Sequence, residues 1–385
     1  MVSNFAKLLA AAALPLAAAS RYTNFTTSAM IPWAGADSSG VDWQSPVHLS
    51  FRINSPSGRR FTPLADTGSQ GIVLPAKYVG YDFNRGCEEQ GGRHGDEYLS
   101  SSRVYYEGCW VERALFFNVD ERNHSLHPVV ETHATLLAMV NSSRCLDYDA
   151  TRTPPCLDKR DMCINSTGVA MLGIGFGRES SAASQATPDK NPLRNVAAIN
   201  SQPVSNTSFS AGYVLDSRGV ALGLTDANTA GAAFYALQPV AYPGVADWMG
   251  ARACIVINDT APACGNALLD TGLNQSYVSL PIGTLPNPIP KLPNGSRVQI
   301  AFGEPGLPPV AVEEFVVGTP SVPNVNPWHV SVALRTPTFV NTGRFFYRGF
   351  SVVFDDLNGY FGLKKVESDG VGENEGQRLV VQDDL

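Results

Sequence analysis

The sequence has few charged residues and lacks the common signatures of nucleotide, zinc and serine-hydrolase chemistry. Charged residues make up 16% of the 385 residues, and the formal charge is −7. No basic cluster is present, which argues against nucleic-acid binding. The sequence contains no H-E-x-x-H pair, no G-x-S-x-G elbow and no phosphate-binding Gly-rich loop followed by Lys-Ser/Thr. We interpret the clustered histidines His124, His127 and His133 as loop surface rather than a metal site, so no metal or cofactor is expected.

Long apolar runs are equally scarce. The longest, Leu8 to Ala19, follows Lys7 and ends in small alanines, which is typical of a secretory signal peptide at residues 1–19. It is too short to span a bilayer, so we expect secretion without a membrane anchor. Residues 20–40 are polar and small, which predicts a flexible N-terminal segment. Residues 367–385 are polar and rich in acidic residues, which predicts a disordered acidic tail.

Glycine, proline and short apolar runs are abundant instead. The chain has 35 Gly and 27 Pro, and 44% of its residues are hydrophobic. This composition favours an all-β protein of short strands with a few short helices. Val47, Leu49, Phe51 and Ile53 alternate with polar residues, as in a half-buried strand.

One tripeptide occurs twice in matching apolar surroundings. Asp66-Thr67-Gly68 follows FTPLA, and Asp270-Thr271-Gly272 follows NALL. Each copy predicts a strand, a sharp turn that presents one carboxyl group, and a second strand. Two such copies in one chain indicate two related halves.

These paired motifs resemble the catalytic loops of pepsin-like aspartic endopeptidases. The closing block with Val353-Phe354-Asp355 and Gly362-Leu363 is similar to that family's last segment, and Met171-Leu172-Gly173 to the run behind its first loop. The resemblance implies a bilobal all-β fold, with an N-terminal lobe at 41–215 and a C-terminal lobe at 216–366. It implies a monomer that binds an extended peptide or protein substrate.

The chemistry that the resemblance implies is hydrolysis by a water held between two carboxyl groups. Two such groups in one site share a proton, so one can act as base and the other as acid. Asp66 and Asp270 are the expected catalytic pair. The supporting residues are expected to hold the two loops together and to donate hydrogen bonds to the carboxylates: Thr67, Gly68, Ser69, Thr271 and Gly272.

Three positions depart from the family pattern. Leu273 replaces a Ser or Thr, which predicts a lost hydrogen bond to Asp270 and a raised pKa or looser orientation of that carboxyl. Val73 stands where many members have a tryptophan. Asn341-Thr342 and Arg344 replace an apolar pair and an aspartate.

The flap that the resemblance implies is a hairpin around Glu107-Gly108. Tyr106 best matches the flap tyrosine, with Tyr105 as the alternative. The three departures leave open a non-catalytic binding protein on the same fold, or an accessory protein of a biosynthetic pathway that acts on one dedicated substrate.

Cysteines and sequons fit an oxidising, secreted environment. Cys254 and Cys264 could close a hairpin before the second motif, and Cys87 and Cys109 could bracket the loop ahead of the flap. The pairing among Cys145, Cys156 and Cys163 stays open. Glycosylation is expected at seven sequons, whereas Asn274 is expected to stay unmodified because it lies beside Asp270. The seven are Asn24, Asn123, Asn141, Asn165, Asn206, Asn258 and Asn294.

Overall fold

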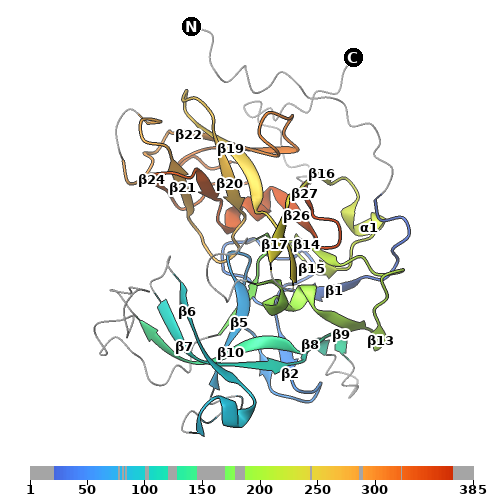
Figure 1. Cartoon of the computed structure of the whole chain (residues 1–385). Helices are drawn as coiled ribbons and strands as arrows, with labels where there is room; N and C mark the ends of the chain where they lie inside the picture. The colour runs from blue at the N-terminus through green and yellow to red at the C-terminus, as the bar shows by residue number, and fades with distance from the viewer. Residues whose placement is uncertain are drawn as a thin grey trace.

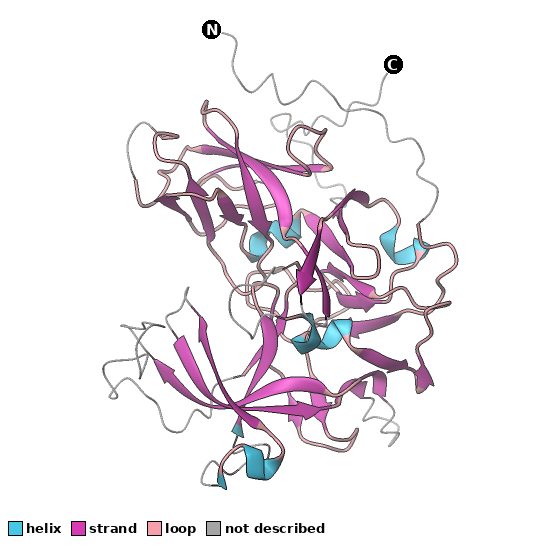
Figure 2. Cartoon of the chain, in the orientation of Figure 1, coloured by secondary structure: helices cyan, strands magenta, loops and turns pink. Residues whose placement is uncertain are grey.

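The computed structural model describes residues 21–76, 79, 82, 85–99, 104–119, 128–144, 170–177, 187–242, 245–285, 289–321 and 323–366. The expected signal peptide, the expected tail, the three cysteines of open pairing and the sequons at Asn123 and Asn165 lie outside these residues. Within them the chain is mostly β-strand, as the composition predicted (Figure 2). None of the helices in this part of the chain has the length and apolar character needed to cross a membrane.

Two sheets, here called sheet 1 and sheet 2, each carry one Asp-Thr-Gly motif. The strand order of sheet 1 is β4 (Leu64–Asp66), β11 (Met171–Ile174), β5 (Gln70–Pro75), β10 (Thr135–Arg144), β7 (Val104–Arg113) and β6 (Arg93–Leu99). The strand order of sheet 2 is β23 (Ala311–Val316), β22 (Arg297–Phe302), β19 (Ala251–Ile257), β20 (Ala263–Leu268), β25 (Phe339–Asn341), β21 (Ser276–Leu280) and β24 (Val330–Leu334). Figure 1 places sheet 1 in the lower part of the molecule and sheet 2 in the upper part.

Four strands of each sheet share one topology. In sheet 1, β11 lies between β4 and β5, parallel to the first and antiparallel to the second, and β10 runs parallel to β5. In sheet 2, β25 lies in the same way between β20 and β21, and β24 runs parallel to β21. Each motif is therefore the connection between two strands that a third, distant strand holds apart. The repeat predicted from the two tripeptides extends to this strand arrangement.

A third sheet lies between the other two (Figure 1). Its order is β1 (Ala29–Pro32), β15 (Gly219–Leu222), β14 (Gly212–Asp216), β26 (Phe350–Asp355), β27 (Tyr360–Lys365) and β16 (Ala233–Ala236). It joins segments from the beginning, middle and end of the described chain.

A fourth sheet packs beside sheet 1, and the remaining elements are short. The fourth sheet has the order β13 (Gln202–Pro203), β12 (Val196–Ile199), β9 (Pro128–Thr132), β8 (Leu115–Val119), β2 (Phe51–Ile53) and β3 (Arg60–Phe61), and β17 (Pro239–Tyr242) pairs with β18 (Val245–Trp248). The helices are α1 (Asp226–Thr229) and the 3₁₀ segments η4 (Glu88–Gln90), η6 (Pro188–Lys190), η7 (Pro192–Arg194) and η8 (Arg344–Arg348).

The prediction of a flexible segment at residues 20–40 is wrong for residues 21–40. β1 forms four register pairs with β15, from Ala29↔Leu222 to Pro32↔Gly219. Tyr22 is buried, and its hydroxyl donates to Asp355 Oδ2 at 2.9 Å. Trp33 is also buried. The polar local composition concealed this anchoring, because the partners lie about two hundred residues or more away.

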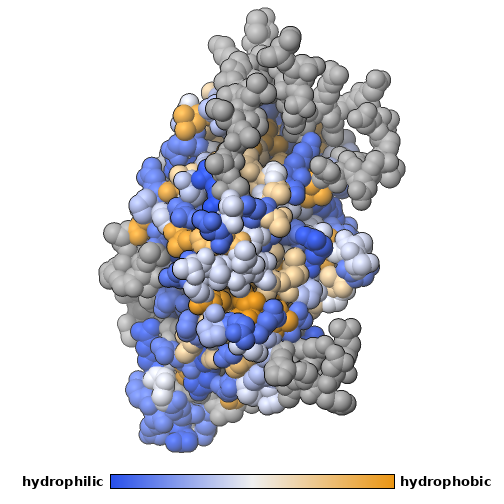
Figure 3. Space-filling view, turned by 90° about the vertical axis from the view of Figure 1, so that its right-hand side faces the viewer, coloured by the Kyte–Doolittle hydropathy of each residue, from blue (hydrophilic) through white to orange (hydrophobic). Residues whose placement is uncertain are grey.

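Both disulfide predictions are confirmed. Cys254 and Cys264 are register partners in the β19–β20 hairpin, with Cα atoms 3.9 Å apart. Cys87 and Cys109 join the loop before β6 to β7, with Cα atoms 5.5 Å apart. The expected alternation is confirmed as well, since Val47, Leu49, Phe51 and Ile53 are all buried. The sequon residues Asn24, Asn206, Asn258 and Asn294 are exposed. On the face shown in Figure 3, hydrophilic residues cover most of the surface and apolar ones form smaller groups among them.

Candidate active site

The structure brings Asp66 and Asp270 together where the two motif loops meet. A Cβ atom on Gly68 would lie 2.6 Å from Asp270 Oδ2, and one on Gly272 would lie 2.8 Å from Asp66 Oδ1. Any side chain at either glycine would therefore overlap the carboxyl of the opposite loop. These two positions require glycine because of this close approach.

Each carboxyl accepts the same pair of hydrogen bonds. The backbone N–H groups of Gly68 and Gly272 donate to Oδ1 of Asp66 and Asp270, both at 2.7 Å. Ser69 Oγ donates to Asp66 Oδ2 at 2.7 Å, as expected. The expected loss of the matching bond at Asp270 is wrong, because Asn341 Nδ2 donates to Asp270 Oδ2 at 2.6 Å. Asn341 comes from a strand 71 residues away from Asp270, so the local sequence carries no signal for this bond.

The two threonines lock the loops to each other. Thr67 N donates to Thr271 Oγ1 at 3.0 Å, and Thr271 N donates to Thr67 Oγ1 at 2.9 Å. Each hydroxyl also donates across the junction, from Thr67 to Leu269 O at 2.5 Å and from Thr271 to Ala65 O at 2.7 Å. Both threonines are buried, so these bonds hold the carboxyl groups in register without competing water.

Replacing Thr67 by valine is expected to lower the free energy of unfolding by about 2 kcal/mol. Valine keeps the shape but leaves the buried N–H of Thr271 without its acceptor, and an unsatisfied buried group costs about 1–3 kcal/mol. Denaturant unfolding of the disulfide-bonded protein would measure the change. Thr67→Ser is the control, because it keeps the hydroxyl group. It should keep most of the stability that Thr67→Val loses. Equal destabilisation by both variants would contradict the role of the hydroxyl.

An aromatic stack packs against this junction of the two loops. Tyr347, in η8, donates its hydroxyl to Leu269 O at 3.0 Å, and its ring stacks on Trp43 with centroids 4.8 Å apart. Trp33 packs edge-on against Trp43. Arg344 donates to Trp43 O at 3.1 Å and to Gln44 O at 3.2 Å, so the departure at Arg344 ties η8 to this stack.

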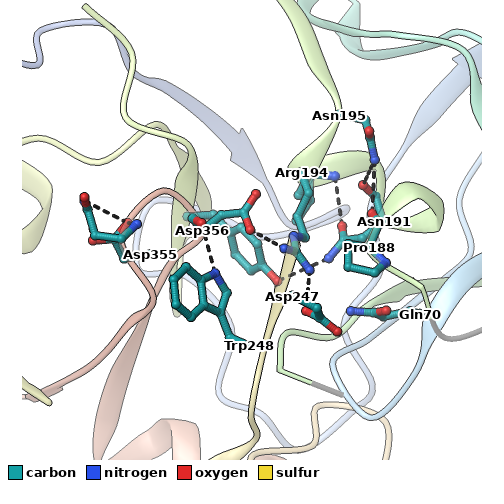
Figure 4. Close-up of polar contacts among 12 residues, drawn as sticks. Gln70, Pro188, Asn191, Arg194, Asn195, Asp247, Trp248, Asp355 and Asp356 are labelled. Atoms are coloured by element: carbon teal, nitrogen blue, oxygen red, sulfur yellow. Dashed lines mark hydrogen bonds and ion pairs between the residues drawn. The ribbon is translucent and has the colours of Figure 1, made fainter. Parts of the chain in front are cut away.

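A buried ion-pair network lies behind the first loop (Figure 4). Gln70 and Asn191 both donate to Gly175 O at 2.9 Å, and Gly175 N donates to Ser69 O at 2.7 Å. Nearby, Arg194 pairs with Asp247 Oδ1 at 2.9 Å and with Asp356 (Figure 4). Two carboxylates around one guanidinium join η7, β18 and the β26–β27 turn. The network therefore holds Gly175 in place, and the backbone N–H of Gly175 donates to Ser69 O.

Burial sets the protonation of the pair. Asp270 is 5% exposed, whereas Asp66 is half-buried. Burial and then the negative charge of Asp66 raise the pKa of Asp270 well above its ordinary value, while the bonds from Asn341 and Gly272 act in the opposite direction. The pair therefore keeps one proton into the neutral range, with Asp66 on the side that reaches solvent.

The expected hairpin differs from the observed one. β7 runs without interruption from Val104 to Arg113, so Glu107-Gly108 is not a turn. β6 and β7 form the hairpin, and its last register pair is Leu99↔Val104. Tyr106 pairs with Glu97, two register pairs before Leu99↔Val104. Tyr105 pairs with Tyr98, one register pair before Leu99↔Val104. Residues 93–99 (RHGDEYL) show no apolar alternation, so the local sequence carries no signal for this strand, and its charged residues suggested a loop.

Comparison with known proteins does not identify this chain. No model of a protein family matches it, and no curated protein does either. The assignment of function therefore rests on the geometry of the two loops.

Proposed function

We propose that this protein is an aspartic endopeptidase of the pepsin-like fold, which hydrolyses peptide bonds with a water activated between Asp66 and Asp270. One observation carries the proposal. Two loops of like sequence, held by strands of like topology, present carboxyl groups with matching donors, and a glycine in each loop makes room for the opposite carboxyl. A pair of carboxyl groups that share one proton is the group required for this reaction.

The proposed reaction uses the unequal burial of the two carboxyl groups. Asp66, the more accessible carboxyl group, takes a proton from the water as the water oxygen attacks the carbonyl carbon. Asp270, whose burial favours the protonated form, gives its proton to the carbonyl oxygen. The tetrahedral diol then breaks its C–N bond. Asp66 passes its proton to the leaving nitrogen, and one diol hydroxyl returns a proton to Asp270.

The proposed substrate is an extended peptide that lies across the two loops. Gly68, Ser69, Gly272 and Leu273 are only half-buried, so the loop surfaces beside the carboxyl groups remain accessible. The β6–β7 hairpin is the proposed flap. Its tyrosine remains a prediction, with Tyr106 joined by Tyr98 and Tyr105 as candidates closer to the tip. The proposed N-terminal and C-terminal lobes, at 41–215 and 216–366, would each contribute one loop.

Secretion is part of the same proposal. Disulfides at Cys87–Cys109 and Cys254–Cys264 fit an oxidising environment. The signal peptide and the glycosylation sites remain sequence-based predictions.

The test is hydrolysis of an unfolded protein substrate by the purified chain between pH 3 and pH 7. We expect cleavage that a peptide-mimic inhibitor of aspartic proteases abolishes and that a serine-protease inhibitor and a metal chelator leave intact. Inhibitor binding without cleavage would favour the binding-protein alternative. Neither cleavage nor binding would overturn the proposed function.

A further inference from the structure

We propose that Asn341 is a positioning residue for Asp270, which replaces in the second loop the hydroxyl donor that Ser69 supplies in the first. The catalytic consequence rests on the proposed function. The hydrogen bond itself does not, since its donor, acceptor and distance are properties of the folded chain.

The strand registers give Asn341 an exact counterpart in the first half. Asn341 pairs with Leu268 and with Tyr277. Met171 pairs with Leu64 and with Val73. Leu268 and Tyr277 lie 204 residues after Leu64 and Val73, the same separation as between Thr67 and Thr271. Asn341 and Met171 are therefore equivalent positions of the two related strand sets.

The polar and apolar roles of two positions are exchanged between the halves. In the first half, Ser69 is the polar residue, and its hydroxyl lies 3.6 Å from the apolar Met171 sulfur. In the second half, Leu273, three residues after its aspartate as Ser69 is, is apolar, and Asn341 is polar. Each half thus keeps one donor for Oδ2 and one apolar neighbour. The donor comes from the motif loop in one half and from the distant strand β25 in the other.

The surroundings of Asn341 fix the direction of its amide. Asn341 is 6% exposed, and its Oδ1 accepts the N–H of Gly343 at 3.0 Å. Gly343 has φ +69°, and a Cβ there would lie 2.6 Å from Gln275 O, so this turn is closely defined. With its oxygen engaged, the side chain presents its NH₂ group to Asp270. Reversal of the amide would place two oxygens against each other and leave a backbone N–H unpaired.

An amide N–H differs chemically from the hydroxyl that it replaces. A hydroxyl can donate to a carboxylate or rotate and accept from a protonated carboxyl, whereas an N–H can only donate. Asn341 therefore requires an acceptor at Oδ2 of Asp270, as the N–H of Gly272 does at Oδ1. This bond also opposes the effect of burial on the pKa of Asp270. Asn341 therefore fixes the orientation of the Asp270 carboxyl group and favours its ionised form.

The test uses Asn341→Val, Leu273→Ser and the double variant. For Asn341→Val, kcat/KM should fall about tenfold, and the alkaline limb of its pH profile should move up by about one unit, because a donor to a charged acceptor is lost. Leu273→Ser alone should move that limb down. The double variant should return it toward the wild type. Asn326→Val is the matched control, since it removes another buried amide, which donates to Thr319 O, and it should leave the profile unchanged.

A second measurement separates this inference from the proposed function. Unfolding is measured against pH for Asn341→Val, both alone and combined with Asp270→Asn. A higher folded-state pKa of Asp270 makes the variant lose stability relative to wild type as pH rises, and only where Asp270 is present. If the wild-type protein neither cleaves the substrate nor binds the inhibitor, the proposed function is refuted. The stability measurement still tests the hydrogen bond between Asn341 and Asp270. A loss of stability that is equal at every pH, or an unshifted limb in an active enzyme, would overturn the role of Asn341.

Discussion

Asp66→Asn and Asp270→Asn are each expected to lower kcat by at least about 10³-fold with little change in KM. Asparagine keeps the size of the side chain and can still accept the glycine N–H. It can neither take a proton from water nor give one to the carbonyl oxygen, and acid–base catalysis contributes about 10²–10⁴-fold for each group. Steady-state hydrolysis of a peptide near the optimum pH would measure the loss.

Asp259→Asn is the control for this pair, because Asp259 is exposed and forms an ion pair with Arg297 at 3.4 Å. It should keep wild-type kcat. The two active-site variants should also differ in stability. Asp270→Asn removes a buried acid with a raised pKa, so its stability should vary less with pH than that of wild type. Retention of full activity by either active-site variant would refute the dyad.

Glu313→Gln is expected to raise the free energy of unfolding by about 3 kcal/mol at pH 7 and to change it little at pH 4. Glu313, in β23, is 3% exposed, and its Oε2 has no hydrogen-bond partner among the residues that the structure describes. It pairs in register with the buried Ile300 and lies on the same side of the strand as Phe315. Burial alone raises its pKa from the ordinary 4.5 to about 8.

The sign follows from proton binding. Between pH 4.5 and about 8 the folded chain holds a proton on Glu313 that the unfolded chain has released. The contribution of Glu313 to stability is therefore greatest at acid pH and falls as pH rises through this window. Glutamine mimics the protonated acid at every pH, so it removes this loss. The raised pKa of Asp270 acts in the same direction.

Denaturant unfolding at pH 4, 6 and 7 would test the prediction. Glu314→Gln is the matched control, since the neighbouring side chain is exposed and should leave the pH dependence unchanged. A gain for Glu313→Gln that is the same at pH 4 and pH 7 would show that packing, and not titration, causes it.

Local sequence patterns determined the parts of this protein that depend on neighbouring residues. The two Asp-Thr-Gly turns, the glycines that make room for the carboxyl groups and the donor Ser69 all lie within one short segment each. The Cys254–Cys264 bridge closes one hairpin for the same reason. Composition and alternation were sufficient for the all-β class, since burial on one face of a strand imposes a period of two.

The tertiary structure decided whatever depends on pairing between distant segments. It anchors residues 21–40 through β1 and Tyr22, and it pairs β6 with β7 up to Leu99↔Val104, so the hairpin does not turn at Glu107-Gly108. It also brings Asn341 to Asp270 across 71 residues, so that a position which looked like a lost contact keeps its donor. The physical reason is that strand register is set by the partner that buries each face, and no local pattern specifies that partner.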